Sequence, residues 1–158
     1  MDFWKPGVTV AAVVEHDRRF LLVREHTSDG LRLNQPAGHL DPGESLPQAV
    51  VRETLEETAW EVEPQSCVGV YMARFHRPET DVTYLRFAFA CRALRHDASR
   101  ALDHGIVEAV WLTPDEVRAC RAQHRSALVL ETMEDYLAGR RYPLELIRTD
   151  PRCLHLPV

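Results

Sequence analysis

The sequence contains few cysteines, and no two of them have metal-binding spacing. The four cysteines, at positions 67, 91, 120 and 153, form no C-x-x-C pair, and the eight histidines are scattered along the chain. A structural zinc site needs closely spaced Cys and His ligands, so none is expected. We interpret the cysteines as free thiols, which are typical of a reducing, cytoplasmic compartment.

Long apolar runs and an excess of positive charge are also missing. No apolar run approaches the roughly 20 residues of a membrane-spanning helix, and the N-terminus lacks a signal peptide's apolar core. Nineteen Lys and Arg against 24 Asp and Glu give a formal net charge of −5. Domains that bind nucleic acid usually carry a basic face. We therefore expect no membrane association and no stable nucleic-acid partner. A small anionic substrate is compatible with this net charge.

The length and composition are those of one soluble domain. A chain of 158 residues with 45% hydrophobic residues can bury enough surface to fold unaided. No internal repeat, low-complexity tract or linker divides it, so a single domain over residues 1–158 is expected, as a monomer or homodimer.

Hydrophobic patterning predicts a sheet flanked by helices, in the α/β (α+β) class. A polar segment at 26–30 and another at 95–104 are expected to be loops. Thr113 begins a capped helix, and a further helix near 129–137 ends at Gly139. The segments expected as strands are 8–14, 20–24, 66–76, 82–94 and 108–112, with a short extended segment at 31–36.

A capping box predicts the start of a helix near Leu46. Ser45 and Gln48 have the required spacing, and Pro47 lies in the first turn, where its missing N–H costs nothing. At about 100° per residue, three glutamates share one helix face, and Val51 and Leu55 point the opposite way. These glutamates are Glu53, Glu56 and Glu57.

Such an acidic face is ordinarily just solvated, because neighbouring like charges on a helix repel by a few tenths of a kcal/mol. Here the apolar back face holds the helix against a core, and Arg52 can pair with Glu56 at i+4. The preceding loop adds a further carboxylate, Glu44. Clustered carboxylate oxygens are the ligands that hard cations such as Mg²⁺ and Mn²⁺ prefer. The pattern therefore favours a metal site.

The stretch 38–60 resembles the Nudix box, G-x5-E-x7-R-E-U-x-E-E-x-G-U, in which U is a bulky apolar residue. Six of the seven fixed residues match at the right spacing: Gly38, Glu44, Arg52, Glu53, Glu56 and Glu57. Ala59 replaces the box glycine, Thr54 replaces an aliphatic residue, and Trp60 occupies the last apolar place. Ala59 either adopts the left-handed conformation at a cost of about 1 kcal/mol or lets the helix continue. We expect a shifted helix end and a working site.

The resemblance implies a Nudix fold, an α/β/α sandwich with a mixed sheet and the box loop and helix on one side. It implies that Mg²⁺, with Mn²⁺ as a substitute, is held by Glu53, Glu56, Glu57 and the carbonyl of Gly38. Arg52 would orient the glutamates through Glu44 or Glu56. The implied reaction is attack of a metal-activated water on phosphorus.

Segments outside the box are similar to the NudJ-type branch of bacterial phosphatases. These segments are 5–11, 34–40, 85–87 and 139–145. The branch hydrolyses nucleoside di- and triphosphates and the pyrophosphates of thiamine and its hydroxymethylpyrimidine precursor. Two alternatives stay open: another Nudix specificity, such as ADP-ribose or a dinucleoside polyphosphate, and a non-catalytic nucleotide-sensing module. Intact box carboxylates favour the enzyme.

The remaining site residues are candidates from type and position alone. The general base is either a box glutamate or one of two acidic residues before Trp111, Asp103 and Glu108. The substrate-binding candidates are Gln35, Arg24, Arg74, Arg86 and Tyr84. Each of the arginines fits an exposed sheet position equally well, and aromatic residues in strands usually belong to the core.

Overall fold

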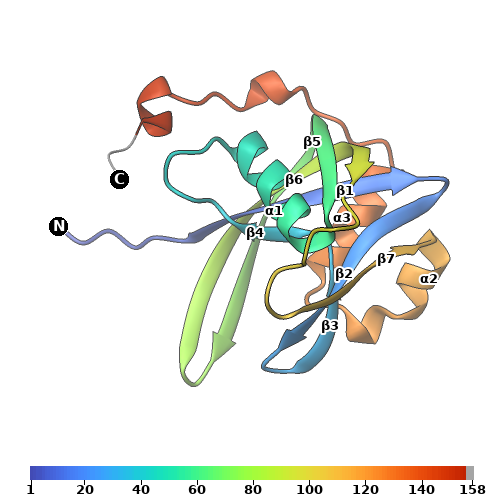
Figure 1. Cartoon of the computed structure of the whole chain (residues 1–158). Coiled ribbons are helices and arrows are strands. Elements are labelled where there is room, and N and C mark those ends of the chain that lie inside the picture. Colours follow the sequence, from blue (N-terminus) through green and yellow to red (C-terminus); the bar gives the residue numbers. More distant parts are fainter. Residues whose placement is uncertain (156–158) are drawn as a thin grey trace.

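The computed structural model of the chain describes residues 1–155; residues 156–158, the end of the expected domain, lie outside the described residues. Seven strands form one sheet, flanked by helices (Figure 1). The strands are β1 (Gly7–His16), β2 (Arg19–Thr27), β3 (Gly30–Asn34), β4 (Ala37–His39), β5 (Trp60–Arg77), β6 (Thr80–His96) and β7 (Ile106–Leu112). The helices are α1 (Leu46–Thr58), α2 (Pro114–Ala119) and α3 (Leu128–Leu137), with three short 3-10 turns.

The sheet is mixed, as expected. Its main path runs β3-β2-β1-β6-β5, with β4 paired to β1 and β7 paired to β2. β1 and β6 are parallel over eight residue pairs, from Gly7↔Tyr84 to Val14↔Cys91, and every other strand pairing within residues 1–155 is antiparallel. This arrangement places the short strand β4, in which the box begins, beside β1, the middle strand of the main path.

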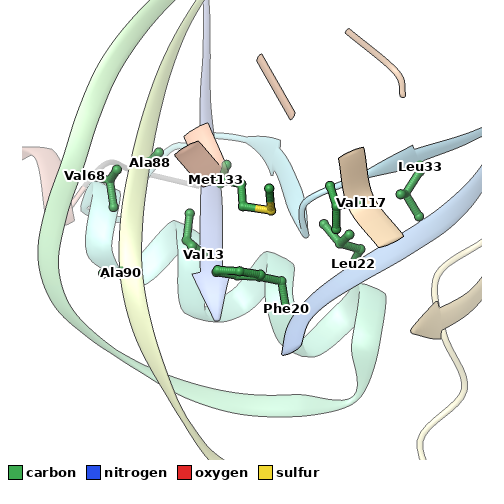
Figure 2. Packing of buried hydrophobic residues seen from close by; sticks show 10 residues of the cluster. Val13, Phe20, Leu22, Leu33, Val68, Ala88, Ala90, Val117 and Met133 are labelled. Atoms are coloured by element: carbon green, nitrogen blue, oxygen red, sulfur yellow. The ribbon is translucent and has the colours of Figure 1, made fainter. Parts of the chain in front are cut away.

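Alternating side chains of β1 pack on both faces of the sheet, because helices cover both. Ala11 and Val13 belong to a cluster that includes Met133 of α3 (Figure 2). Val10 and Val14 belong to a second cluster with Val50 of α1. The continuous apolar run of β1 therefore holds the box helix rigidly against the sheet. Among residues 1–155, no helix is long and apolar enough to cross a membrane.

Helices α1 and α2 begin where their capping boxes predict. The Ser45 and Thr113 side chains each accept a hydrogen bond from the backbone N–H three residues on, and Gln48 and Glu116 complete the boxes. The predicted loop at 26–30 is wrong: β2 continues to Thr27 and turns directly into β3, with Thr27 paired to Gly30. β5 and β6 are also longer than predicted, since their hairpin pairing continues from Trp60↔His96 to Arg77↔Thr80.

The buried face of α1 is rotated from the predicted one. Val50 and Thr54 are fully buried, whereas Val51 and Leu55 are only partly buried. Thr54 fits this apolar environment because its hydroxyl donates to the carbonyl of Val50 at 2.7 Å. With this bond made, threonine occupies the aliphatic position of the box without leaving a polar group unpaired.

The expected shift of the helix end is wrong. α1 ends at Thr58, and Ala59 adopts the left-handed conformation, with φ 62° and ψ 16°. Its N–H donates to the carbonyl of Leu55, and its own carbonyl accepts from the N–H of Asp97, both at 2.9 Å. The helix cannot continue because β5 begins at the next residue, Trp60. Tertiary structure therefore holds a residue with a Cβ in a conformation that favours glycine.

We expect Ala59→Gly to leave the free energy of unfolding unchanged or slightly higher. Relief of the left-handed strain, about 1 kcal/mol, offsets the loss of a buried methyl, about 0.8 kcal/mol. Ala49→Gly is the matched control, because Ala49 is buried in the interior of α1 in the right-handed helical conformation. The free energy of unfolding of this variant should fall by more than about 1 kcal/mol. Urea titration compares the two. An equal loss in both variants would show that Ala59 is unstrained.

Candidate active site

Three carboxylates meet beside α1. Glu53, Glu56 and Asp103 each offer an oxygen, and these oxygens all lie within 4.8 Å of one another. The two glutamates come from successive turns of the helix. Asp103 comes from the loop between β6 and β7, and its N–H donates to the carbonyl of Glu56 at 3.0 Å. This backbone bond ties a distant acidic residue to the box helix.

Gly38 leaves room for one of these carboxylates. A Cβ built at position 38 would lie 2.0 Å from Cδ of Glu53 and 2.2 Å from each of its carboxylate oxygens. Such distances are far inside van der Waals contact. The absence of a side chain at residue 38 is therefore what allows Glu53 to lie against β4.

Arg52 links the box loop to the glutamates. Its guanidinium donates to both oxygens of Glu44, at 2.6 and 2.9 Å, and to the carbonyl of His39 at 2.9 Å. It also donates to Glu53 at 2.9 Å and to Glu56 at 3.1 Å. The hydrogen bond with Glu44 is the largest cause that raises the pKa of Arg52. Arg52 thus stays charged and fixes three carboxylates at once, since a planar guanidinium can bind them in a fixed geometry.

Glu57 is the buried glutamate of the box and is not a member of the group of three. It is 7% exposed and accepts a hydrogen bond from the N–H of Ala37 at 2.7 Å. Burial raises its pKa to about 8, and the hydrogen bond from Ala37 only partly opposes this. Burial likewise raises the pKa of Glu53. The structure therefore brings Asp103, rather than Glu57, together with Glu53 and Glu56.

In metal-free protein, Glu57 should make stability fall as pH rises. Its pKa is about 8 in the folded protein, against an ordinary value of 4.5. Between these values the folded protein holds a proton that the unfolded chain has lost, so the free energy of unfolding decreases from about pH 4.5 to about pH 8 and then levels off. Urea titrations in EDTA at pH 5.5 and 8.5 measure this change, and Glu57→Gln should make it smaller. Equal pH dependence in both proteins would show that Glu57 is ionised throughout.

The donor set fits a hard divalent cation. All three grouped side chains offer carboxylate oxygens, which Mg²⁺ and Mn²⁺ prefer, and no Cys or His belongs to the group. Arg52 offsets part of the negative charge, and a cation would balance the rest. The residues present therefore match the predicted cofactor in chemistry.

A cavity of about 440 Å³ opens beside the box loop. Gly38 and His39 form part of its wall, so it adjoins the strand against which Glu53 lies. Phe75 and Tyr84 form an aromatic side, with ring centroids 5.6 Å apart, and Tyr84 also contacts His39 at 5.8 Å. The other lining residues are Thr9, Glu25, Ser28, Asn34, Ala37, Arg77, Thr80, Val82, Arg86, Arg125, Ser126 and Leu128.

The substrate-binding candidates differ in where they lie and in what they contact. Arg86 and Tyr84 line the cavity. Gln35 is buried behind Arg86, with its Nε2 donating to the carbonyl of Val129 at 2.7 Å. Arg24 is paired with Glu108 at 3.0 Å. Arg74 is exposed and paired with Asp81 at 2.6 Å near the tip of the β5–β6 hairpin.

Sequence reasoning missed three charged residues of the cavity wall, Glu25, Arg77 and Arg125. Glu25 accepts from Arg125 at 3.0 Å, and Arg77 pairs with Asp29. Arg77 lies just beyond the predicted strand 66–76, and two-residue alternation along β5 places it on the same face as Phe75. Nothing in the sequence around Arg125 indicates that the loop before α3 reaches the cavity.

A mixed sheet between helices, with a loop and helix that group carboxylates at one side, defines the fold of Nudix hydrolases. The NUDIX domain model matches residues 5–133 of the chain. The chain therefore belongs to the Nudix family, and it is a phosphohydrolase of that family.

Known relatives support both the family and the type of enzyme. The chain is 36% identical over 144 residues to phosphatase NudJ of Escherichia coli K12, covering 91% of this chain and 92% of the relative. A solved Nudix hydrolase from Nitrosomonas europaea is 47% identical, with a TM-score of 0.87 over 93% of this chain and 99% of that one. An ADP-ribose pyrophosphatase from Streptococcus suis shares only the fold, at 22% identity and a TM-score of 0.62 over 86% and 91%.

Proposed function

We propose that the chain catalyses Mg²⁺-dependent hydrolysis of a nucleoside di- or triphosphate or of a thiamine-type (hydroxymethylpyrimidine) pyrophosphate. The observation that carries this proposal is the grouping of Glu53, Glu56 and Asp103 within 4.8 Å, beside a cavity of about 440 Å³. Similarity to phosphatase NudJ over 91% of the chain supports a phosphate ester or anhydride as substrate.

The side chains divide the work of phosphoryl transfer, which needs charge neutralisation and correct positioning. Glu53 and Glu56 would hold the cation, with Glu57 and the carbonyl of Gly38 as further predicted ligands. When bound, the cation supplies positive charge to the phosphate oxygens and activates water. Arg52 keeps the two glutamates in place through its bonds to both and to the box loop.

Asp103 is the better of the two candidate bases outside the box. Its carboxylate lies within the group of three, whereas Glu108 is engaged by Arg24. Asp103 would accept the proton of the attacking water while the leaving group departs from phosphorus. The aromatic side of the cavity, Phe75 and Tyr84, offers a surface on which a pyrimidine or purine ring can stack.

Product formation, separated by ion-exchange chromatography, tests this proposal, because ADP-ribose would give AMP and ribose 5-phosphate and no orthophosphate. Nucleoside di- and triphosphates, thiamine pyrophosphate, hydroxymethylpyrimidine pyrophosphate and ADP-ribose are each assayed with Mg²⁺ and with EDTA. We expect turnover of the pyrimidine pyrophosphates or simple nucleotides with Mg²⁺ only. Turnover of ADP-ribose alone would assign another Nudix specificity, and turnover in EDTA would refute the role given to the carboxylates.

A further inference from the structure

Arg86 is a buried cation without a carboxylate partner. Its side chain lies on β6 at the cavity wall and is 6% exposed. Among the ion pairs of residues 1–155, none includes Arg86, and its Nε has no hydrogen-bond partner there. Burying an unpaired charge costs several kcal/mol unless something compensates it. Desolvation lowers the pKa of Arg86 to about 10, which still leaves the guanidinium charged at neutral pH.

The partners that Arg86 does have are neutral amides. One terminal nitrogen donates to Oε1 of Gln35 at 2.7 Å, and the other makes a longer contact with Asn34 at 3.5 Å. Gln35 is fixed in turn by its bond to the carbonyl of Val129, in the first turn of α3. These bonds orient the guanidinium without neutralising it.

The other two arginines of the cavity differ in this respect. Arg77 is paired with Asp29, and Arg125 is paired with Glu25. Arg86 is therefore the cavity arginine that makes no ion pair among residues 1–155, and Glu25 and Glu57 act on its charge only beyond contact distance. Its strand position is also central, because Arg86 pairs with Thr9 of β1, and Thr9 pairs with His39 of the box strand β4.

We infer that Arg86 binds an anionic phosphoryl group of the substrate, namely the one that is not attacked, and that Gln35 is the positioning residue that aims it. Paired residues on neighbouring strands present their side chains to the same face of the sheet. A row from Arg86 through Thr9 to His39 thus lines the cavity on the face of the sheet opposite to Glu53, which lies against Gly38. Gly38 also lines the cavity, so a diphosphate with one phosphoryl group at Arg86 would extend the other past Gly38 toward the carboxylates. This inference rests on the proposed function for the direction of the substrate.

Inorganic pyrophosphate in EDTA is the probe, because its binding requires neither metal nor turnover. Calorimetry on the full chain should show binding to the wild type and at least tenfold weaker binding to Arg86→Met, with Arg86→Lys in between. Arg92→Gln is the matched control, since Arg92 lies on the same strand but is exposed and paired with Glu63, and its affinity should equal that of the wild type. No binding by the wild type, or equal binding by Arg86→Met, would overturn the inference.

The role of Gln35 is tested by a double-mutant cycle. Gln35→Met should weaken pyrophosphate binding less than Arg86→Met does, and the double variant should bind no more weakly than Arg86→Met alone. If Gln35 had only a structural role, the losses of binding free energy in the two single variants would add in the double variant. With a substrate that turns over, Gln35→Met should raise KM and leave kcat nearly unchanged. If no substrate is hydrolysed with Mg²⁺ while the pyrophosphate results hold, the proposed function fails and the anion site stands.

Discussion

Replacing Glu56 by Gln should lower kcat/KM by at least about a thousandfold, because the substitution removes one of the charges that hold the cation opposite the phosphate. The fold should be unaffected. Gln has the same shape, and its amide oxygen can still accept the bond that Arg52 donates to Oε2 at 3.1 Å. Phosphate release with Mg²⁺ measures the loss, and urea titration measures stability.

Glu63→Gln is the control for the general effect of removing an acidic charge. Glu63 is on β5, is exposed, and pairs with Arg92 at 3.2 Å, so this variant should keep full activity. Glu57→Gln extends the test to the buried glutamate of the box. Full activity in both Glu56→Gln and Glu57→Gln would refute the assignment of the box carboxylates to a metal.

Gly38→Ala should cost at least about a hundredfold in kcat/KM, because misplacing catalytic groups by an ångström has effects of that size. The added Cβ would lie 2.0 Å from the carboxylate carbon of Glu53. Either Glu53 moves away from Glu56 and Asp103, or β4 moves away from α1. Both changes disrupt the carboxylate group, and initial rates across Mg²⁺ concentrations should show weaker metal dependence as well as slower turnover.

Stability and activity must be separated for this variant, and Gly139→Ala provides the comparison. Gly139 has φ +84° and nothing within 4 Å of an added Cβ, so alanine there costs backbone strain without touching the site. It should lower stability by about 1 kcal/mol and leave the rate unchanged. Normal activity in Gly38→Ala would show that the close approach to Glu53 is not required.

Local sequence signals were sufficient for most of the helices and strands and for the position of the box. The capping box at Ser45, the alternation along β5 and the apolar run of β1 each depend on nearby residues, so each could be predicted. The conformation of Ala59 could not, because β5 and the bond from Asp97, 38 residues away, determine it.

The composition of the site depended in the same way on distant contacts. Box spacing predicted Glu53, Glu56 and Glu57 as one group, and Glu57 accepts a hydrogen bond from the N–H of Ala37. Asp103 joins Glu53 and Glu56 through a loop whose sequence contains no motif. Likewise, the sequence pattern does not distinguish Arg24, Arg74 and Arg86, because each is an arginine in a predicted strand. Only strand pairing shows that Arg86 is buried at the cavity while the other two have carboxylate partners.

Metal binding tests the central claim most directly, because it measures the proposed role of the carboxylates without depending on the choice of substrate. Mn²⁺ binding is followed by electron paramagnetic resonance in the wild type, in Glu53→Gln/Glu56→Gln and in Glu63→Gln. We predict that the wild type and Glu63→Gln bind Mn²⁺ with equal affinity and that Mg²⁺ competes for the site. The double variant should bind at least tenfold more weakly. Equal affinity in all three proteins would contradict the account, because the cation would then be bound elsewhere.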